Sequence, residues 1–213
     1  MYPNLSCLTI KGENIFNFIN KLSASDIEKK CSYIFFLNEN ARYLGDCFFI
    51  DSLNVLISTE KILIGLKNYF ERMDIRKKFK FEFDKRAVWY SFQSEISEFC
   101  FDDHRLDGKI YLNLNSNFMT CENDKELYYQ NRLNNKLAEF EDFEFEKSLI
   151  INYGSVSRFI SKSKGCYPGQ EIVARYGFES AKKTVDVVEK IDETVLKIFF
   201  EKNGKYLVYK KLV

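Results

Sequence analysis

The stretch Lys164-Gly165-Cys166-Tyr167-Pro168-Gly169-Gln170-Glu171 is the most informative part of this sequence. Two glycines flank a cysteine, a tyrosine and a proline, a pattern typical of a tight turn that holds one side chain in a defined position. Proline suits the first turn of a helix, so the pattern predicts a short helix from Pro168. Cys166 would lie just ahead of that helix, with Lys164 two residues away. The helix dipole and the ammonium both favour a thiolate, so we expect a lowered pKa and raised reactivity for Cys166.

The surroundings of this stretch are basic, although the whole chain is nearly neutral. With 32 Lys and Arg against 31 Asp and Glu, the formal net charge of +1 gives no global attraction to DNA or to an anionic membrane. Between residues 158 and 183 the balance is +4. The charged residues there are Arg158, Lys162, Lys164, Arg175, Lys182 and Lys183 against Glu171 and Glu179. This cluster suits a small polyanionic ligand, and a solvated charged face explains it equally well.

Composition and length exclude several classes of protein. The 213 residues suit one large or two small domains, and 16% aromatic residues are too many for a disordered chain. No segment reaches the ~20 apolar residues of a membrane helix, and the N-terminus does not resemble a signal peptide. Six scattered cysteines without a C-x-x-C pair, and a single histidine, His104, argue against a zinc site. We therefore expect a cytosolic protein, with His104 in a turn and the cysteines other than Cys166 in the core.

Apolar periodicity predicts an α+β fold in the order β-α-β-β-β-α-β-β at the N-terminal end. The order argues against a doubly wound nucleotide-binding sheet, and the glycine-rich phosphate-binding motifs are absent from the sequence. Helices are predicted over 14–22, after the N-cap Thr59 to Met73, from Asn123 to about Phe140, and from Pro168. Strands are predicted over 6–11, 31–37, 43–50, 53–58, 79–83, 87–92 (as the neighbour of 79–83), 109–114, 184–188, 195–200 and 206–209, with a loop over 152–165.

The quoted stretch matches K-G-C-Y-x-G-Q-E, and the chain thereby resembles the YgfZ family. That family contains folate-binding proteins of iron–sulfur cluster biogenesis, related to the aminomethyltransferase (T-protein) of the glycine-cleavage system. The resemblance spans roughly residues 5 to 183. Its further elements are the strand, glycine and helix at 8–25 with Ser25-Asp26, the strand 42–50 with Arg42 and Asp46, Asp103-His104-Arg105 with Gly108, Arg132 in a helix, and Asn152.

The resemblance implies a three-lobed, ring-like fold with tetrahydrofolate in a central cavity and the cysteine of the motif exposed near it. Residues 1–182 would form the folate-binding region of the aminomethyltransferase-like fold. Residues 183–213 would form a strongly shortened C-terminal β lobe, which predicts a more open folate cavity. The family supports maturation or repair of iron–sulfur enzymes, one of which modifies tRNA, so folate and iron–sulfur client or assembly proteins are the expected partners.

The resemblance also implies a set of site residues. Cys166 would act as a thiolate, either ligating iron transiently or exchanging with a sulfur-containing partner, beside Lys164 and Asp46. Folate contacts would come from Asn152 and Asp46 on the pterin side, from Tyr167, and from Lys164, Arg175 and Arg158 near the glutamate tail. Gln170 and Glu171 would organise the loop, and Gly165, Pro168 and Gly169 would shape the turn. No resident metal is expected.

Two alternatives remain open at this point. One is an aminomethyltransferase-like enzyme in which Asp46 assists catalysis. T-proteins have adjacent aspartates where this chain has Gly45-Asp46, and they lack the cysteine motif. Both differences argue against this interpretation. The other alternative is a non-catalytic docking module for iron–sulfur or tRNA-modifying enzymes. We expect a monomer that binds neither membranes nor nucleic acid directly, because the basic run lacks aromatic stacking platforms.

Overall fold

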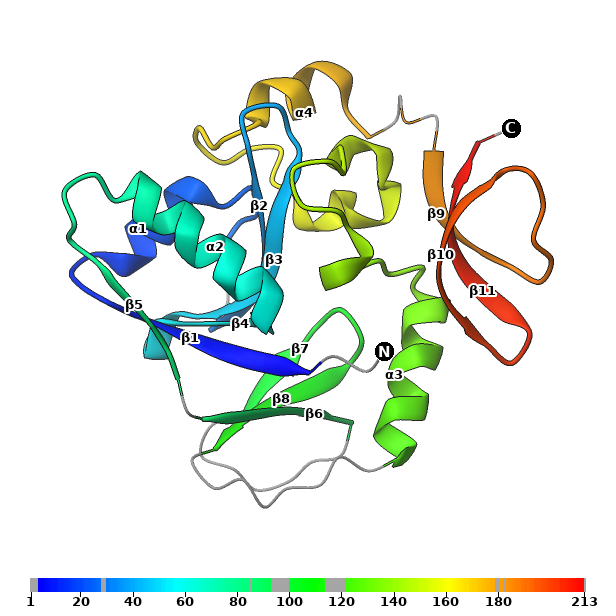
Figure 1. The fold of residues 1–213 in the computed structure, drawn as a ribbon, viewed down its shortest axis with the longest axis horizontal. Coiled ribbons are helices and arrows are strands. Elements are labelled where there is room, and N and C mark those ends of the chain that lie inside the picture. Colours follow the sequence, from blue (N-terminus) through cyan, green and yellow to red (C-terminus); the bar gives the residue numbers. More distant parts are fainter. Residues whose placement is uncertain are drawn as a thin grey trace.

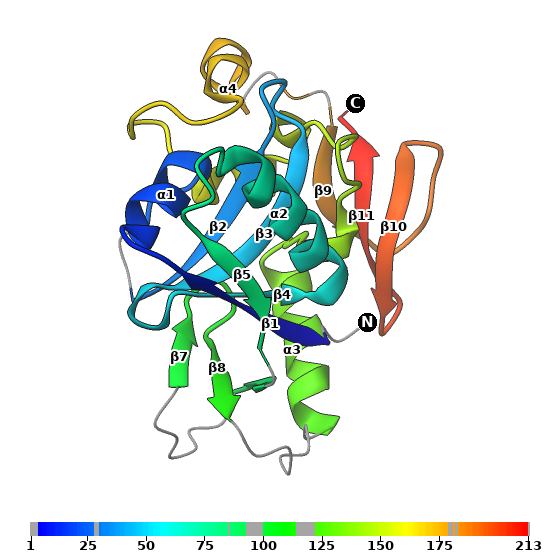
Figure 2. The same cartoon turned by 60° about the vertical axis from the view of Figure 1, so that its left-hand side comes forward.

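The computed structural model describes residues 4–27, 30–84, 86–92, 100–113, 122–178, 181 and 183–212. The largest of its three antiparallel sheets has the strand order β2-β3-β4-β1-β5 (Figure 1). Helices α1 (Ile15–Leu22) and α2 (Glu60–Met73) cover one face of this sheet (Figure 2). The strands are β1 (Leu5–Lys11), β2 (Cys31–Leu37), β3 (Tyr43–Ile50), β4 (Val55–Thr59) and β5 (Lys80–Phe83).

Two three-stranded sheets complete the fold. One has the order β6-β8-β7, with α3 (Glu122–Asn134) beside it, and the other has the order β10-β11-β9. Their strands are β6 (Ala87–Ser91), β7 (Cys100–Asp103), β8 (Gly108–Asn113), β9 (Lys183–Val188), β10 (Val195–Lys202) and β11 (Lys205–Lys211). Helix α4 is Gln170–Tyr176, and 3-10 helices cover Asp51–Leu53, Phe140–Asp142, Ile150–Asn152 and Gly154–Phe159.

The β2–β3 hairpin is the middle layer of the molecule. Every residue of β3 is buried, because one face of the hairpin packs under α1 and α2 while the other packs against the segment 137–173 and the third sheet. A strand buried on both faces reads as a nearly continuous apolar run. Asp46 is the exception in this run, and it therefore needs hydrogen-bond donors inside the protein.

Most predicted elements are confirmed, and the errors have local causes. Both strands of the β2–β3 hairpin begin and end at the predicted residues. Strand β6 pairs with β8 rather than with 79–83, because β5 pairs with β1. Helix α3 ends at Asn134, since Lys136 and Phe140 adopt positive φ angles of 47° and 48°. Helix α4 begins two residues later than predicted, because Gly169 is left-handed at φ 83°.

Smaller corrections concern side chains. Thr59 is the N-cap of α2 as predicted, but its hydroxyl makes no capping hydrogen bond. Met73 and Phe83, both expected on buried faces, are exposed. The expected loop 152–165 contains the 3-10 helix Gly154–Phe159. The predicted strand residue Leu114 lies outside the described residues.

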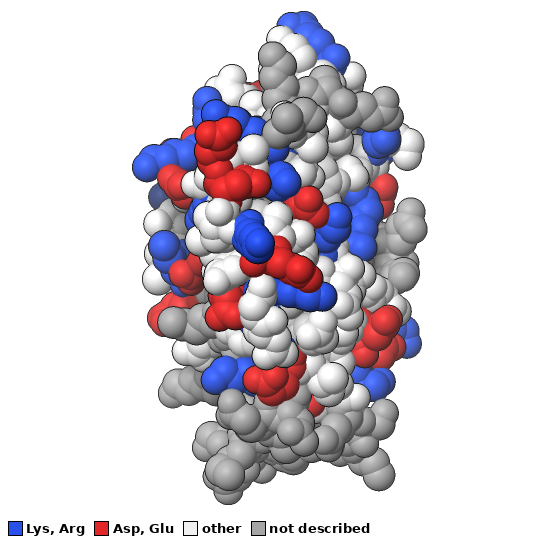
Figure 3. Space-filling view, turned by 90° about the vertical axis from the view of Figure 1, so that its right-hand side faces the viewer, with Lys and Arg blue, Asp and Glu red and all other residues white. Residues whose placement is uncertain are grey.

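The outer surface carries charges of both signs. On the face that presents the third sheet, basic side chains lie next to acidic ones (Figure 3). Within the part of the chain that the structure describes, no helix is long and apolar enough to span a bilayer.

Candidate functional site

The Lys164 ammonium fastens the cysteine loop to the end of α1. It donates to the main-chain oxygens of Asn20 (2.6 Å), Ser23 (3.0 Å) and Ser25 (2.9 Å), and also contacts the side-chain oxygens of Asn20 and Ser23. The last carbonyl groups of a helix lack partners within the helix and carry partial negative charge, so a cation is stabilised there. Burial lowers the pKa of Lys164, and the nearby carboxylate of Asp26 opposes this change.

Three further residues of the motif lock the loop in place. The Tyr167 hydroxyl donates to the main-chain oxygen of Ser161 (3.0 Å), and the Gln170 side-chain amide donates to the main-chain oxygen of Lys164 (3.2 Å). Gly169 lies so close to the β2–β3 turn that a Cβ atom there would be 2.6 Å from the main-chain oxygen of Asn38. The loop is thus fixed between α1 and the tip of the β2–β3 hairpin.

Cys166 is exposed on this fixed loop, as the family resemblance implies. A Cβ atom at the neighbouring Gly165 would meet no atom within 4 Å, so the space around the loop is open. The two features expected to favour a thiolate are placed differently from the prediction. The hydrogen bonds of the Lys164 ammonium go to the end of α1, and the seven-residue helix α4 starts only at Gln170. The raised reactivity expected of Cys166 remains a prediction.

The predicted basic cluster does not converge on one site. Arg175 forms an ion pair with Glu171 (2.6 Å), and both side chains are exposed. Lys183 lies over the ring of Tyr209, with 5.7 Å between its ammonium and the ring centroid. Asn152, another expected folate contact, lies beside the hydroxyl of Tyr209 on β11 and favours its ionised form. Lys182 and Glu179 lie outside the described residues.

A buried charge network occupies the middle of the molecule. Arg105 donates to Asp103 (2.8 Å) and to Glu139 (2.6 Å), and all three side chains are at most 2% exposed. Its guanidinium also lies 3.9 Å from the ring centroid of Tyr33. Burial alone lowers the pKa of Arg105, but the two carboxylates more than reverse this, so Arg105 stays charged. Arg132 joins the network through Glu139 and Asp142.

Asp46 lies in a closed cage beside this network. Its carboxylate accepts hydrogen bonds from the hydroxyls of Tyr33 and Tyr43 and from the backbone N–H of Phe140 (2.8 Å). Burial raises the pKa of Asp46 to about 6, although these three hydrogen bonds lower it. The side chain is fully buried. The expected hydrogen bond from Asp46 to a pterin does not fit this structure, because Tyr33 of β2, Tyr43 of β3 and the backbone of Phe140 enclose the carboxylate.

A pocket, which we call the Tyr33 pocket, lies between the charge network and the cysteine loop. It has a volume of about 280 Å³. Its lining includes Asp26, Tyr33, Phe48, Asp103, Arg105, Arg158, Phe159 and Ser161. The carboxylate of Asp26 and the guanidinium of Arg158 form no hydrogen bond or ion pair with any described residue, and the guanidinium lies 4.8 Å from the ring centroid of Phe159. Burial lowers the pKa of Arg158, and the nearby positive charge of Arg105 lowers it further, because both disfavour the charged guanidinium.

Ser161 joins this pocket to the cysteine loop. Besides lining the pocket, it accepts the Tyr167 hydroxyl through its main-chain oxygen, and its hydroxyl accepts the backbone N–H of Lys164 (3.0 Å). Sequence reasoning missed Ser161 and Tyr33. A lone carboxylate in an apolar strand, Asp46, was the signal that a neighbouring tyrosine had to turn inward.

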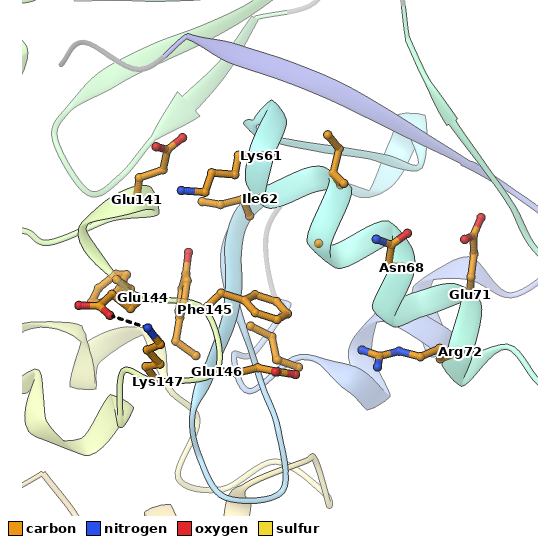
Figure 4. A pocket seen from close by; sticks show the side chains of 15 residues that line it. Lys61, Ile62, Asn68, Glu71, Arg72, Glu141, Glu144, Phe145, Glu146 and Lys147 are labelled. Atoms are coloured by element: carbon orange, nitrogen blue, oxygen red, sulfur yellow. Dashed lines mark ion pairs between the residues drawn. The ribbon is translucent and has the colours of Figure 1, made fainter.

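A larger hollow, here the α2 groove, lies between α2 and residues 141–147 (Figure 4). It measures about 1020 Å³ and is lined by apolar residues such as Ile62, Ile64 and Phe145. Its rim mixes charges of both signs, with Lys61 and Arg72 on α2 and Glu141, Glu144 and Lys147 on the opposite segment. Nothing in this rim converges on a single ligand group, so we favour the Tyr33 pocket as the candidate site.

Three of the four other cysteines that the structure describes fit the expected core role. Cys7, Cys31 and Cys47 are buried, Cys100 is half-buried, and Cys121 lies outside the described residues. Burial raises the pKa of Cys7 and of Cys31 to about 12, which suppresses thiolate chemistry there. The described part of the chain holds no group of three or more His, Cys, Asp or Glu side chains suited to a metal ion.

The fold is similar to that of a solved structure, the glycine cleavage system aminomethyltransferase T from Bartonella henselae. The two agree with a TM-score of 0.64 at 10% sequence identity, over 98% of this chain and 76% of that chain. The similarity shows that this chain has the mixed α+β aminomethyltransferase fold. The shortened C-terminal β lobe remains a prediction, and β9–β11 form a three-stranded sheet of their own. No family model and no curated protein matches the sequence.

Proposed function

We propose that this protein is a cytosolic, tetrahydrofolate-binding accessory protein for iron–sulfur cluster assembly or repair, and that Cys166 carries its chemistry toward a partner protein. The aminomethyltransferase fold and the K-G-C-Y-x-G-Q-E stretch support the proposal. The observation that carries it is the double role of Ser161. This residue lines the Tyr33 pocket and also anchors the loop that presents the exposed thiol. A ligand in the pocket therefore bears directly on the position of the loop.

The Tyr33 pocket fits the chemistry of a folate. A pterin offers N–H donors along one edge, which suit the uncommitted carboxylate of Asp26, and its ring suits the aromatic side chains of Tyr33 and Phe159. The glutamate carboxylates suit the uncommitted guanidinium of Arg158. At about 280 Å³ the pocket is slightly smaller than the ~300 Å³ at which drug-sized ligand sites begin, so it matches the ring portion and leaves the tail outside. A bound tetrahydrofolate would supply a carrier for one-carbon groups.

The motif residues divide into a frame and a reactive group. Lys164, Tyr167, Gly169 and Gln170 hold the loop, so the thiol of Cys166 stays in one orientation without having to be ordered by a partner. In exchange with a partner's disulfide, the Cys166 thiolate attacks one sulfur, a mixed disulfide forms, and the other sulfur leaves as a thiolate. In the alternative step, the thiol loses its proton as it ligates an iron ion of the client's cluster.

Calorimetric titration with tetrahydrofolate tests the folate part of the proposal. We expect the wild type to bind, and Asp26→Asn and Arg158→Gln each to weaken binding by about tenfold or more, which is about 1.4 kcal/mol. Lys162→Gln, at an exposed residue on the other side of the loop, is the matched control and should bind normally. A wild type that does not bind tetrahydrofolate would remove this part of the proposal.

A cellular assay tests the thiol. Cys166→Ala should keep tetrahydrofolate affinity and lose the support of iron–sulfur enzyme activity, because the thiol lies outside the Tyr33 pocket. Full activity of the iron–sulfur enzymes in cells with Cys166→Ala would contradict the thiol role. The remaining interpretation would be the non-catalytic docking module. That module predicts instead that charge reversal at Lys183 abolishes partner binding while Cys166→Ala preserves it.

An aminomethyltransferase-like activity is the second candidate, and the fold similarity is the observation that favours it. Its expected carboxylate, Asp46, is fully buried and bound by three donors, so in this conformation it does not touch a substrate. This candidate predicts turnover of methylene-tetrahydrofolate by the purified protein. Turnover that Asp46→Asn abolishes would favour it over the accessory role.

A further inference from the structure

A further pocket, which we call the α4 pocket, lies directly beside the cysteine loop. It has a volume of about 410 Å³ and is formed by the loop, by α4 and by the two residues that follow α4. Helix α4 lies at the periphery of the molecule (Figure 1). Tyr167 lines the pocket and directly follows the exposed Cys166, so the pocket wall begins one peptide unit from the thiol, about 3.8 Å between Cα atoms.

The walls of the α4 pocket have the composition of a protein-binding surface. Besides Tyr167, its apolar lining includes Val173, Tyr176 and Phe178. The side chain of Tyr176 is 52% exposed, which is unusual for a ring of this size. Tyrosine and arginine are enriched at protein interfaces, because a rigid ring buries a large area at a small entropic cost. The pocket therefore suits an apolar side chain that a partner inserts.

The charges of the α4 pocket favour an acidic partner. Its lining, all of which the structure describes, contains two cations, Lys162 and Arg175, and no carboxylate. Lys162 forms no hydrogen bond or ion pair with any described residue. Arg175 pairs with Glu171 outside the lining, and an ion pair as exposed as this one is weak. A carboxylate over the pocket would thus be attracted to Lys162, and a second cation would be repelled.

We infer that the α4 pocket docks a peptide segment of a partner protein, in which the reactive cysteine lies one to three residues from an aromatic side chain flanked by an acidic residue. The inference rests on the proposed function, in which Cys166 exchanges with a sulfur of that partner. An extended segment advances about 3.3 Å per residue, so this spacing lets the aromatic side chain enter the pocket while the partner's sulfur meets Cys166. Docking holds the two sulfurs together, which removes much of the entropic cost of their reaction.

The test uses the synthetic peptide Asp-Phe-Gly-Cys-Gly-Phe-Asp with blocked ends, whose cysteine carries thionitrobenzoate as a mixed disulfide. The Cys166 thiolate attacks the cysteine sulfur of the peptide, a disulfide between Cys166 and the peptide forms, and thionitrobenzoate leaves as a coloured thiolate. The matched peptides replace both Asp by Lys, or both Phe by Gly. For the wild type we expect the first peptide to react at least about tenfold faster than either matched peptide. Cys166→Ser gives the background from other thiols.

Two variants test the pocket itself. Lys162→Glu should reverse the preference between the Asp and Lys peptides while keeping the affinity for tetrahydrofolate, because Lys162 does not line the Tyr33 pocket. Tyr176→Ala should reduce the advantage of Phe over Gly by at least about fivefold, and it should fold because the ring is half exposed. Lys205→Glu makes the same charge change at an exposed residue where β11 begins, and it is the matched control that should keep the wild-type preference.

The outcomes separate this inference from the proposed function. Equal rates for the three peptides overturn the inference, and so does a preference that Lys162→Glu leaves unchanged or that Lys205→Glu also reverses. If the mixed disulfide of glutathione with thionitrobenzoate reacts faster than every peptide, the pocket belongs to a small anionic thiol instead. If Cys166 reacts with no disulfide, the exchange step of the proposed function fails and the inference fails with it. The expected peptide preference in a protein that does not bind tetrahydrofolate would support the inference and remove only the folate part of the proposed function.

Discussion

Asp46 and Cys166 carry the two reactive groups that the sequence singles out, and they lie in opposite surroundings. Asp46 is fully buried in a strand enclosed on both faces, with every hydrogen bond of its carboxylate made inside the protein. Cys166 is exposed on a loop in which hydrogen bonds hold Tyr167 and Gln170 and close packing holds Gly169. The cysteine loop packs against Ala41, and Asp46 lies five residues further along the chain, which is roughly 17 Å of extended strand.

The comparison indicates which of the two reactive groups is accessible to a substrate or a partner. A buried carboxylate that is surrounded by donors stabilises the arrangement of the lobes and is not available to a substrate. A thiol on a rigid exposed loop is available, and the rigidity lowers the entropic cost of meeting a partner. We therefore expect substitutions in the closed centre to change stability, and substitutions in the loop to change function.

The largest expected effect comes from Arg105→Ala in the closed centre. It leaves the carboxylates of Asp103 and Glu139 buried without their cation, which should lower the free energy of unfolding by about 3–5 kcal/mol. Lys109→Ala, which breaks the exposed pair with Asp102, is the control and should cost no more than about 1 kcal/mol. Urea denaturation measures both. Equal costs for the two variants would mean that the centre is not the closed network described above.

Asp46 should give the stability a pH dependence. Its folded-state pKa of about 6 exceeds the ordinary value of 3.8, so the folded protein binds the proton more tightly than the unfolded chain does. The contribution of Asp46 to the free energy of unfolding should therefore fall as pH rises from about 4 to 6, by up to about 3 kcal/mol. Asp46→Asn should remove this decline, and Asp51→Asn, at an exposed aspartate, should keep it. Urea denaturation of the three proteins at several pH values measures this dependence.

The two glycines that flank Cys166 should differ in their tolerance of a side chain. Gly169→Ala forces a left-handed residue and a Cβ atom only 2.6 Å from the main-chain oxygen of Asn38, which should cost about 1–3 kcal/mol. Gly165→Ala should change the free energy of unfolding by less than about 0.5 kcal/mol, because nothing lies near its Cβ position. If thermal unfolding showed the reverse order, the fixed frame of the loop would be wrong.

The smallest expected effect on stability belongs to Cys166 itself. Cys166→Ser should change the free energy of unfolding by less than about 0.5 kcal/mol, because the side chain is exposed. The same change should abolish labelling by a thiol reagent under native conditions and the support of iron–sulfur enzymes in cells. Cys47→Ser is the matched control, since a fully buried hydroxyl should cost about 1–3 kcal/mol. Rapid native labelling that persists in Cys166→Ser would place the reactive thiol elsewhere.

Sequence periodicity predicted the elements well where local and tertiary preferences agree. The β2–β3 hairpin, α2 and the three C-terminal strands were all found, because their apolar spacing matches the faces that they bury. The helix from Asn123 was predicted too long. Leu137 and Phe140 continue the apolar spacing, but the chain turns at Lys136 and buries both residues in different contacts. Periodicity cannot distinguish these cases, since a buried residue after a turn has the same chemistry as one on the helix.

The candidate site was likewise predicted only in part from the sequence. The motif identified the cysteine loop, since glycines that flank a cysteine and a tyrosine have few structural purposes other than a tight turn. It did not identify what Lys164 does. A lysine two residues from a cysteine can act on its sulfur, but here its ammonium reaches the end of a helix some 140 positions earlier in the sequence. Ser161 carries no local pattern at all, and Asp26 was noted only as part of the family resemblance.

The sequence by itself determined that the chain folds into an α+β protein with one exposed, glycine-flanked cysteine, because backbone conformation and apolar spacing are local properties. Only the tertiary structure decided that Asp46 is closed off, that Lys164 is an anchor, and that Ser161 connects a pocket to the thiol. Those facts depend on which distant groups meet in space. Hydrogen bonds and charges act over a few ångströms between residues that the sequence holds far apart, so they exist only once the chain has folded.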